Sequence, residues 1–510
     1  MTLTASRVPA DIIRPTGARV SRPLVIVALV LGALGSTISL IGSWIPSLWG
    51  DEVTSVMSAE RSIPSLFRML GHVDAVHGTY YLALHFWIGA FGASPFSVRF
   101  PSAIGVGAMI VGLVFLGSRL GGARVGILAA TVALVIPRVT YMGEEARSYA
   151  WSAAFVVWLT YLLIHLVSGA PKRRRWIFYA VGVAACAYVF LFSLLILAAH
   201  AVVILLARDR KVLRTWLKSV LVGLVIAIPV IAWGIGERGQ IAFLSARMST
   251  GPRTLFVTQW FGNSAAAIAA WTLIAAALSV AIIGWYRRRS LAVSVAERES
   301  YHPTLVPLAA TWLLASPVIL LVVNAVHPVY SSRYLSFAVP GAALLIGWVL
   351  AKIRPRWLVV PLIATLFATS LVSYGSQRTP YSKNNSDWAQ VAATVKAHAK
   401  AGDGILFDES TRPSRLMRLS MHGYPASYTG LIDIGLDQPW SNTDGWRDTT
   451  VSLSEVPTRL DSIDTVWMVE YRGTQTTADT YDIATLHSLG FTEKQRYTEH
   501  ASEVIRFVRN

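Results

Sequence analysis

The sequence has few charged residues and almost no cysteine. Only 14% of its 510 residues are charged, whereas charged residues make up about 25% of soluble proteins. The mean hydropathy is +0.51. The one cysteine, Cys186, lies in an apolar run and excludes an intrachain disulfide and a thiolate metal cluster. This composition predicts an integral membrane protein.

Acidic residues are also scarce, and several catalytic motifs are missing. The 28 acidic residues are outnumbered by 45 basic ones. Most of the basic residues lie in short loops between apolar stretches, which indicates membrane topology and no nucleic-acid partner. No Gly-rich phosphate-binding loop, nucleophile elbow or HExxH motif occurs. Their absence argues against a soluble nucleotide as the donor in a transfer reaction.

Long apolar stretches dominate the first three quarters of the chain and predict a mainly α, polytopic transmembrane helical bundle. We expect residues 1–22 to be a basic cytoplasmic tail, residues 23–375 to form the transmembrane catalytic domain, and residues 376–510 to form a separate extracytoplasmic domain. Eleven spans are expected, at 23–44, 97–119, 123–140, 149–169, 176–191, 193–208, 215–235, 263–286, 304–326, 332–351 and 357–375.

The loop charges predict which face of the membrane each loop occupies. Basic loops belong on the cytoplasmic side, and they lie at 171–175, 208–211, 287–289 and 352–356. Alternation then places Asp51, Glu52 and the loops at 144–148, 237–261 and 327–333 outside the plasma membrane. Residues 176–208 must cross the membrane twice, because a single crossing would place the basic loop at 208–211 on the outer side. Residues 79–92 reach only about 20 Å as a helix, against a membrane core of about 30 Å, so we expect them to lie in or dip into the outer leaflet.

After Tyr374 the composition becomes that of a soluble domain. A helix is predicted from Asp387, a buried strand at 404–407, a second strand at 465–469, a second helix at 481–489 and a strand at 502–508. The alternation of helix and strand predicts a small α/β domain of about 130 residues.

Ionisable and aromatic side chains gather in the loops predicted to face outward. Such residues at membrane depth are costly and usually functional. Carboxylates combined with Arg and His suit a reaction in which an acceptor hydroxyl loses its proton while a phosphate leaves. The candidates are Asp51, Glu52, His72, Asp74, His77, Arg99, Glu144, Glu145, Arg147, Tyr149, Gln240, His327, Tyr330, Arg333 and Tyr334.

Each assignment has a structural alternative. Asp51 and Glu52 would also suit the positive end of a short amphipathic helix at 53–60, as its cap. Arg147 and Arg333 would also serve as headgroup anchors, and Tyr149 and Tyr334 as ordinary interfacial aromatics. The acidic pairs at 51–52 and 144–145 together would offer oxygen ligands to a divalent cation.

An ordered series of short motifs runs through the first 340 residues: Trp49–Glu52 (WGDE), Asp74–Tyr81 (DAVHGTYY), Gly92–Ser94 (GAS), Val98–Ser102 (VRFPS), Glu145–Ala150 (EARSYA) and Arg333–Leu335 (RYL). Together they resemble the GT-C superfamily of membrane glycosyltransferases. The closest resemblance is to the family 39 group of protein O-mannosyltransferases and their bacterial relatives, with a more distant one to the aminoarabinose transferases of lipid A.

This resemblance implies that Asp51 and Glu52 supply the catalytic base, that the active site opens outward and that the sugar donor is a polyprenyl phosphate. It also implies substrate-binding roles for the matching residues, Tyr81 among them. Where the family often has His-Pro-Pro before its tyrosine pair, this chain has His77-Gly78-Thr79. That variant resembles envelope glycosyltransferases of mycolic-acid bacteria and leaves the acceptor open as a glycan, a lipid or a protein.

The expected activity is therefore transfer of a sugar, with mannose as the first choice and arabinose or another pentose as the alternative. A transporter of polyprenyl-linked sugars is a rival of another class. A transporter would be expected to show broken helices with binding groups near the membrane midplane, and usually internal repeats. Here the apolar spans are almost free of ionisable residues, which favours the enzyme. A purely structural envelope scaffold would leave the acidic pairs unexplained.

Overall fold

The computed structural model describes residues 21–168, 174–241, 250–290, 305–411, 413–472 and 477–510. Residues 1–20 of the basic tail lie outside this part, as do residues 171–173 of one basic loop and residues 242–249 of one predicted outer loop. The chain divides into two compact units. Unit 1 comprises Met1–Leu40, Ser102–Glu144 and Ser148–Tyr374; unit 2 comprises Ile41–Pro101, Glu145–Arg147 and Gly375–Asn510.

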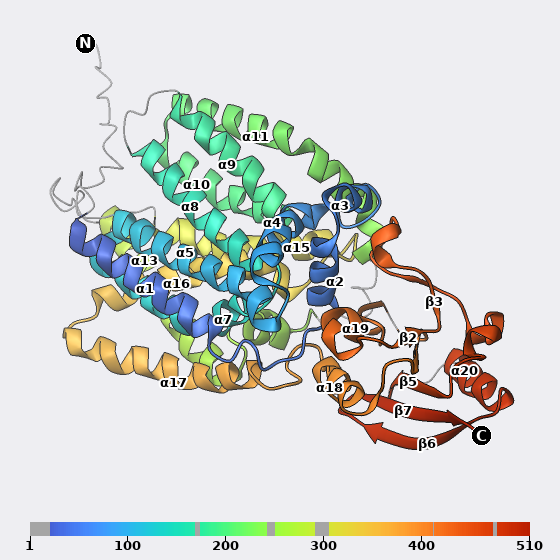
Figure 1. Cartoon of the computed structure of the whole chain (residues 1–510). Helices are drawn as coiled ribbons and strands as arrows, with labels where there is room; N and C mark the ends of the chain where they lie inside the picture. Colours follow the sequence, from blue (N-terminus) through green and yellow to red (C-terminus); the bar gives the residue numbers. More distant parts are fainter. Residues whose placement is uncertain (1–20, 169–173, 242–249, 291–304, 412, 473–476) are drawn as a thin grey trace, which may run out of the picture. The chain divides into compact units, whose positions relative to one another are not determined.

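Long apolar helices confirm the predicted mainly α fold class and identify a multi-pass membrane protein (Figure 1). In the described part of the chain, eight helices are long and apolar enough to cross a membrane. They are α1 (Arg22–Leu40), α5 (Pro95–Gly121), α8 (Tyr149–Val167), α11 (Arg210–Gly236), α13 (Ser264–Ser290), α15 (Leu305–Asn324), α16 (Val339–Lys352) with the preceding turn Ser332–Ala338, and α17 (Val359–Gln377) with the preceding turn Arg356–Leu358.

The described residues therefore hold fewer membrane-length helices than the eleven expected spans: eight, or nine if the bent pair at 123–143 is one span, with the segments at 175–189 and 191–207 forming shorter apolar helices. The span expected at 123–140 is broken. It forms α6 (Ala123–Val135) and α7 (Pro137–Gly143), bent by 69°. Ile136 between them is extended, with φ −67° and ψ 121°. Pro137 explains the break, because a proline disfavours the helical conformation of the residue before it.

Residues 176–208 form two separate helices, in agreement with the predicted division. These are α9 (Arg175–Val189) and α10 (Ile196–Ala207), separated by the extended residue Phe190 and a short 3-10 turn at Leu191–Leu195. Buried polar contacts join them to their neighbours. The Tyr179 hydroxyl lies 2.7 Å from Nδ1 of His200 and accepts a hydrogen bond from Nε1 of Trp216 at 2.9 Å. These contacts fix α9, α10 and α11 against one another.

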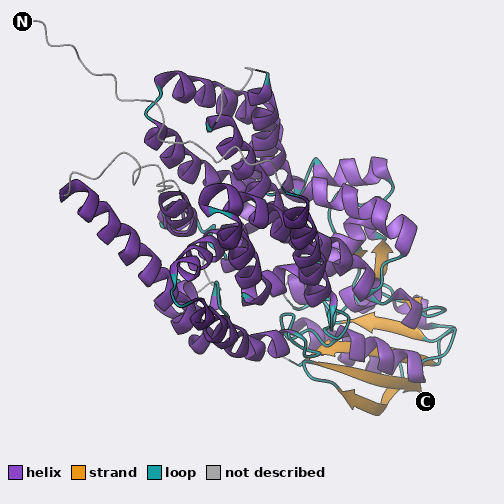
Figure 2. Cartoon of the chain, turned by 90° about the vertical axis from the view of Figure 1, so that its left-hand side faces the viewer, coloured by secondary structure: helices purple, strands orange, loops and turns teal. Residues whose placement is uncertain are grey.

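Unit 2 contains a five-stranded mixed sheet, whose strands are orange in Figure 2. The strand order is β2-β1-β5-β7-β6; β1 runs parallel to β2 and β5, and β7 runs antiparallel to β5 and β6. The strands are β1 (Gly404–Phe407), β2 (Ile432–Asp433), β5 (Thr465–Tyr471), β6 (Phe491–Thr498) and β7 (Ser502–Arg509), with helices α18 (Trp388–His398) and α20 (Thr477–Ser488) and a small ribbon of β3 (Leu436–Gln438) and β4 (Thr449–Thr450).

The three predicted strands and two predicted helices of this region are confirmed. The short strands β2, β3 and β4 and the longer β6, whose central residues are exposed and polar, were not predicted. A polar edge strand carries no hydrophobic alternation, because nothing covers its outer side.

Three helices near the N-terminal end of the chain share a core with this sheet region. They are α2 (Gly50–Glu60), α3 (Ile63–Leu70) and α4 (Gly78–Phe91). Val53 and Tyr81 belong to the same buried cluster as Trp388, Val391 and Phe407. Residues that are more than 300 positions apart in sequence therefore build one packed unit around the acidic pair.

Candidate active site

The acidic pair occupies the first turn of α2, whose N-cap residue is Trp49. The predicted alternative in which Asp51 and Glu52 cap the helix is therefore wrong in its strict form. Trp49 is extended and makes no side-chain cap hydrogen bond. Both carboxylates still lie where the helix dipole favours negative charge.

Hydrogen bonds from the C-terminal residues fix the start of α2. The amide of Ser47 donates to the carbonyl oxygen of Pro380 at 3.0 Å. The amide of Leu48 donates to the hydroxyl of Tyr424 at 2.8 Å, and the hydroxyl of Ser386 donates to the Leu48 carbonyl at 2.7 Å. Ser47 and Leu48, which precede the acidic pair, are thus held by hydrogen bonds to residues from the C-terminal part of unit 2.

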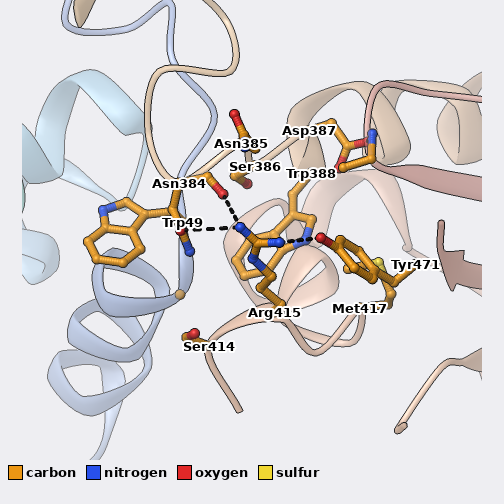
Figure 3. A pocket seen from close by; sticks show the side chains of 12 residues that line it. Trp49, Asn384, Asn385, Ser386, Asp387, Trp388, Ser414, Arg415, Met417 and Tyr471 are labelled. Carbon is orange, nitrogen blue, oxygen red and sulfur yellow. Dashed lines mark hydrogen bonds between the residues drawn. The ribbon is translucent and has the colours of Figure 1, made fainter. Parts of the chain in front are cut away.

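Gly50 is required by a close approach of two backbones. A Cβ atom at this position would lie 2.4 Å from the carbonyl oxygen of Ser414 and 2.9 Å from its Cα atom. Next to this contact, Figure 3 shows Arg415 between Tyr471 and Asn384. Arg415 donates hydrogen bonds to the Tyr471 hydroxyl and to the backbone carbonyl of Asn384. The Arg415 guanidinium, which lines a small pocket together with Trp49, is thus held by contacts within the protein.

Glu52 forms a buried ion pair with Arg99. Nε and Nη2 of Arg99 donate to the two carboxylate oxygens at 2.8 and 2.6 Å, and both side chains have 0% exposure. The amide of Ala146 donates to the same carboxylate at 2.9 Å. Burial by itself would raise the pKa of Glu52, but the charge and hydrogen bonds of Arg99, with Lys383 and the Ala146 amide, outweigh it and lower the pKa.

Asp51 has a different environment. Its side chain is 23% exposed, and its carboxylate lies 3.6 Å from Nη2 of Arg147. Nη1 of Arg147 donates to the hydroxyls of Tyr81 at 3.0 Å and Ser55 at 3.2 Å. The Ser55 hydroxyl donates in turn to the Asp51 carbonyl at 2.9 Å. Asp51 is therefore a partly accessible carboxylate beside a fixed guanidinium.

Asp74 and His77 extend this network. The Tyr81 hydroxyl donates to Oδ2 of Asp74, and Nε2 of His77 lies 3.8 Å from Oδ1 of the same carboxylate. Burial and the charge of Asp74 raise the pKa of Tyr81 well above its usual value. Asp74 has φ +60°, a left-handed conformation that aspartate tolerates better than most residues. The structure thus connects Asp51, Arg147, Tyr81, Asp74 and His77.

Glu145 lies beside these groups in sequence and is fully buried in the short Glu145–Arg147 segment of unit 2. Its backbone carbonyl accepts a hydrogen bond from the Arg147 amide at 2.7 Å. This contact shapes the turn that carries Arg147.

The predicted site residues of unit 1 form a second, aromatic group. The guanidinium carbon of Arg333 lies 6.0 Å from the centre of the Tyr149 ring. Tyr334 stacks on Phe192 with ring centres 5.1 Å apart and lies 6.4 Å from Tyr149. Arg333 and the rings of Tyr149 and Tyr334 therefore form one cluster within unit 1.

Two predicted residues of unit 1 stay apart from this group. Gln240 lies half-buried in the turn Glu237–Ile241, and His327 is exposed after α15. Among the described residues, no hydrogen bond or ion pair joins either of them to another predicted site residue.

Metal ligands do not converge in the described ranges: no group of three or more His, Cys, Asp or Glu side chains there is placed to hold a metal ion. The divalent cation remains a prediction.

Residues 76–233, about a third of the chain, match the sequence profile of the family described as dolichyl-phosphate-mannose-protein mannosyltransferase. The structure is similar to that of ArnT from Cupriavidus metallidurans bound to undecaprenyl phosphate, with a TM-score of 0.58, 12% sequence identity and coverage of 94% of this chain and 97% of that chain. The chain has a GT-C-like fold.

A second solved structure with the GT-C-like fold is the archaeal oligosaccharyltransferase AglB from Archaeoglobus fulgidus, in complex with an inhibitory peptide and a dolichol-phosphate. The match has a TM-score of 0.50 and 11% identity and covers 95% of this chain and 74% of that chain. No curated protein sequence matches the chain significantly. The partial family match and the GT-C-like fold make the chain similar to membrane glycosyltransferases.

Three further side chains of the GT-C site region were not found from sequence. Ser55 lies one helical turn after Asp51, so the helix period at 50–60 could have pointed to it. Lys383, with 1% exposure, helps to lower the pKa of Glu52, and Tyr424 holds Leu48. Lys383 and Tyr424 come from the far end of the chain and carry no local signal.

Proposed function

We propose that this protein transfers a sugar from a polyprenyl-phosphate donor to a cell-envelope glycan, lipid or protein acceptor on the outer face of the plasma membrane. The observation that carries the proposal is the partly exposed Asp51 carboxylate fixed beside the Arg147 guanidinium. This arrangement suits a general base that must be ionised before it accepts the proton of the acceptor hydroxyl.

The geometry favours Asp51 over its neighbour as the base. Both oxygens of Glu52 already accept hydrogen bonds from Arg99 or Ala146, and the side chain is fully buried. Its lowered pKa also makes it the weaker proton acceptor. We therefore assign Glu52 a positioning role: it holds Arg99 and the Ala146 turn, and so places Arg147 next to Asp51.

The proposed reaction is a direct displacement. The acceptor hydroxyl oxygen attacks the anomeric carbon, its proton passes to Asp51, and the bond from that carbon to the phosphate oxygen breaks. Polyprenyl phosphate leaves with the bonding electrons, so it needs a positive charge nearby more than it needs a proton. Arg147 or Arg333 is proposed for that task, with Arg333 as the donor-phosphate ligand, because a guanidinium donates paired hydrogen bonds to phosphate oxygens. Inversion at the anomeric carbon follows.

Two comparisons support a lipid-linked donor. The ArnT and AglB structures contain undecaprenyl phosphate and a dolichol-phosphate, respectively. The description of the matching family names mannose as the transferred sugar, so a mannosyl donor is the first choice here.

The function can be tested with the purified protein in lipid nanodiscs. We would supply polyprenyl-phosphate mannose, its arabinose counterpart and a membrane acceptor extract, and measure release of polyprenyl phosphate. Release with the mannosyl donor, dependent on the acceptor, is expected. Turnover of the arabinosyl donor alone would reassign the sugar. Movement of intact donor across sealed vesicles without release would identify a transporter.

Arg333→Lys is expected to lower transfer at least tenfold although the positive charge is kept, because an ammonium group cannot reproduce the paired hydrogen bonds to phosphate. The measurement is the donor dependence of turnover, with Arg253→Lys, on the exposed start of the turn Thr254–Thr258, as the matched control. A lysine variant with the parent's turnover and donor affinity would reduce Arg333 to a helix anchor.

The predicted topology can be tested by thiol labelling after Cys186 is replaced by alanine. Arg174 is exposed at the predicted cytoplasmic end of α9, and Lys494 is exposed on β6. With an impermeant reagent on intact cells, Lys494→Cys should label and Arg174→Cys should not. The reverse pattern would place the Asp51 region on the cytoplasmic side.

A further inference from the structure

An open groove runs along α9 and α11, which lie side by side (Figure 1). The two helices touch where a Cβ atom at Gly223 would come within 2.6 Å of the Ala180 carbonyl oxygen. Beside this contact, the groove has an apolar wall of exposed side chains: Ile177 (61% exposed), Val181 (53%), Val222 (51%) and Ile226 (45%). This wall faces away from the buried Tyr179–His200 contacts that hold the helices together.

Three cations line the same groove. Arg174 precedes α9, and Arg214 and Lys218 lie on the second and third turns of α11. All three are exposed, and within the described residues none of them has an ion-pair partner. A cluster of unpaired positive charge at one end of an apolar groove is complementary to an anionic group that carries a hydrocarbon tail.

The length of the groove along α11 matches the depth of one membrane leaflet. The thirteen residues from Arg214 to Ile226 rise about 18 Å along the helix, against about 15 Å for half of a membrane core of about 30 Å. The cations lie at the helix ends that adjoin the basic loops at 171–175 and 208–211, which is the cytoplasmic end by the distribution of positive charge.

We propose that this groove is a binding site for an anionic diacyl phospholipid of the cytoplasmic leaflet. Its phosphate lies among Arg174, Arg214 and Lys218, and one acyl chain lies along the apolar wall. The groove is as long as one leaflet is deep, which matches an acyl chain. A polyprenyl chain is much longer than this wall, so the polyprenyl-phosphate donor is the less suitable occupant. The site is separate from the transfer chemistry proposed above.

The test uses the full-length protein in mixed micelles with equal amounts of phosphatidylglycerol and phosphatidylcholine, followed by native mass spectrometry of bound lipid. The parent should retain phosphatidylglycerol over phosphatidylcholine by about tenfold or more, since each basic residue favours an anionic lipid severalfold. Arg214→Gln/Lys218→Gln should bring this preference close to parity. Val222→Trp should reduce retention of phosphatidylglycerol by filling the groove without changing its charge.

The matched control is Arg354→Gln/Arg356→Gln, which removes two exposed positive charges from another basic loop. It should keep the parent's preference. Thermal unfolding is used to check that every variant is folded. If Val222→Trp does not fold, Ile177→Trp takes its place.

Three results would overturn the proposal. The parent could retain both phospholipids equally. The control could lose as much preference as the groove variant, which would mean a general surface-charge effect. Finally, an equal concentration of polyprenyl phosphate could displace phosphatidylglycerol in an Arg214-dependent way, which would assign the groove to the donor. Sugar transfer is measured separately, so failure of this site would leave the proposed function unaffected.

Discussion

Asp51→Asn is expected to lower sugar transfer by about two to four powers of ten, the usual contribution of a general base. The amide cannot accept the proton of the acceptor hydroxyl, but it has nearly the shape of the carboxylate. Asn also suits a helix N-terminus about as well as Asp. Expression, thermal unfolding and donor binding should therefore stay close to those of the parent, and turnover should fall.

Asp461→Asn provides the matched control, because Asp461 is an exposed aspartate of the same unit. It should leave turnover unchanged. Parental turnover in Asp51→Asn would move the base elsewhere, and Glu52→Gln and Asp74→Asn would be the next variants. A loss of donor binding equal to the loss of turnover would instead give Asp51 a binding role.

Arg99→Met should destabilise the protein by about 3–5 kcal/mol, because it leaves the Glu52 carboxylate buried without its partner. The methionine keeps most of the apolar stem, so the loss comes mainly from the charge. Thermal unfolding in detergent measures it. Arg496→Met offers a matched control: Arg496 pairs with Glu493 at 2.8 Å and with Glu503, but its side chain is 38% exposed, and breaking an exposed pair costs only about 0–1 kcal/mol.

The pH dependence of the unfolding free energy distinguishes the loss of this ion pair from a loss of packing. In the parent, the pKa of Glu52 is lowered from its ordinary value of 4.5, so its contribution to stability is present above that pH and is lost as the pH falls through the lowered pKa. In Arg99→Met, burial would raise the same pKa, and protonation would relieve the penalty as the pH falls. The stability gap between variant and parent should therefore narrow as the pH falls through the raised pKa of the variant toward the ordinary value of 4.5.

The double variant Glu52→Gln/Arg99→Met should be more stable than Arg99→Met alone, because it leaves no buried charge. If Arg99→Met and Glu52→Gln/Arg99→Met were equally stable at every pH, Glu52 would carry no charge in the folded Arg99→Met variant.

The sequence by itself determined the membrane class, most helices, and the strands β1, β5 and β7. Hydrophobic runs and alternation are local properties, so they can be read in order along the chain. The same holds for the motifs at Asp51, Tyr81 and Arg147, whose order alone indicated the GT-C type. Sequence also predicted the division of residues 176–208 into two helices, from the position of the basic residues at 208–211.

Only the tertiary structure decided what the two adjacent carboxylates do. Consecutive residues on an α-helix point about 100° apart, so Glu52 faces the buried Arg99 while Asp51 lies beside Arg147 and remains 23% exposed. The partners that fix this difference come from residues 47 positions and more away along the chain. No local sequence pattern predicts the Glu52–Arg99 and Asp51–Arg147 contacts, because the packing of distant segments sets both the burial and the charge partners of these side chains.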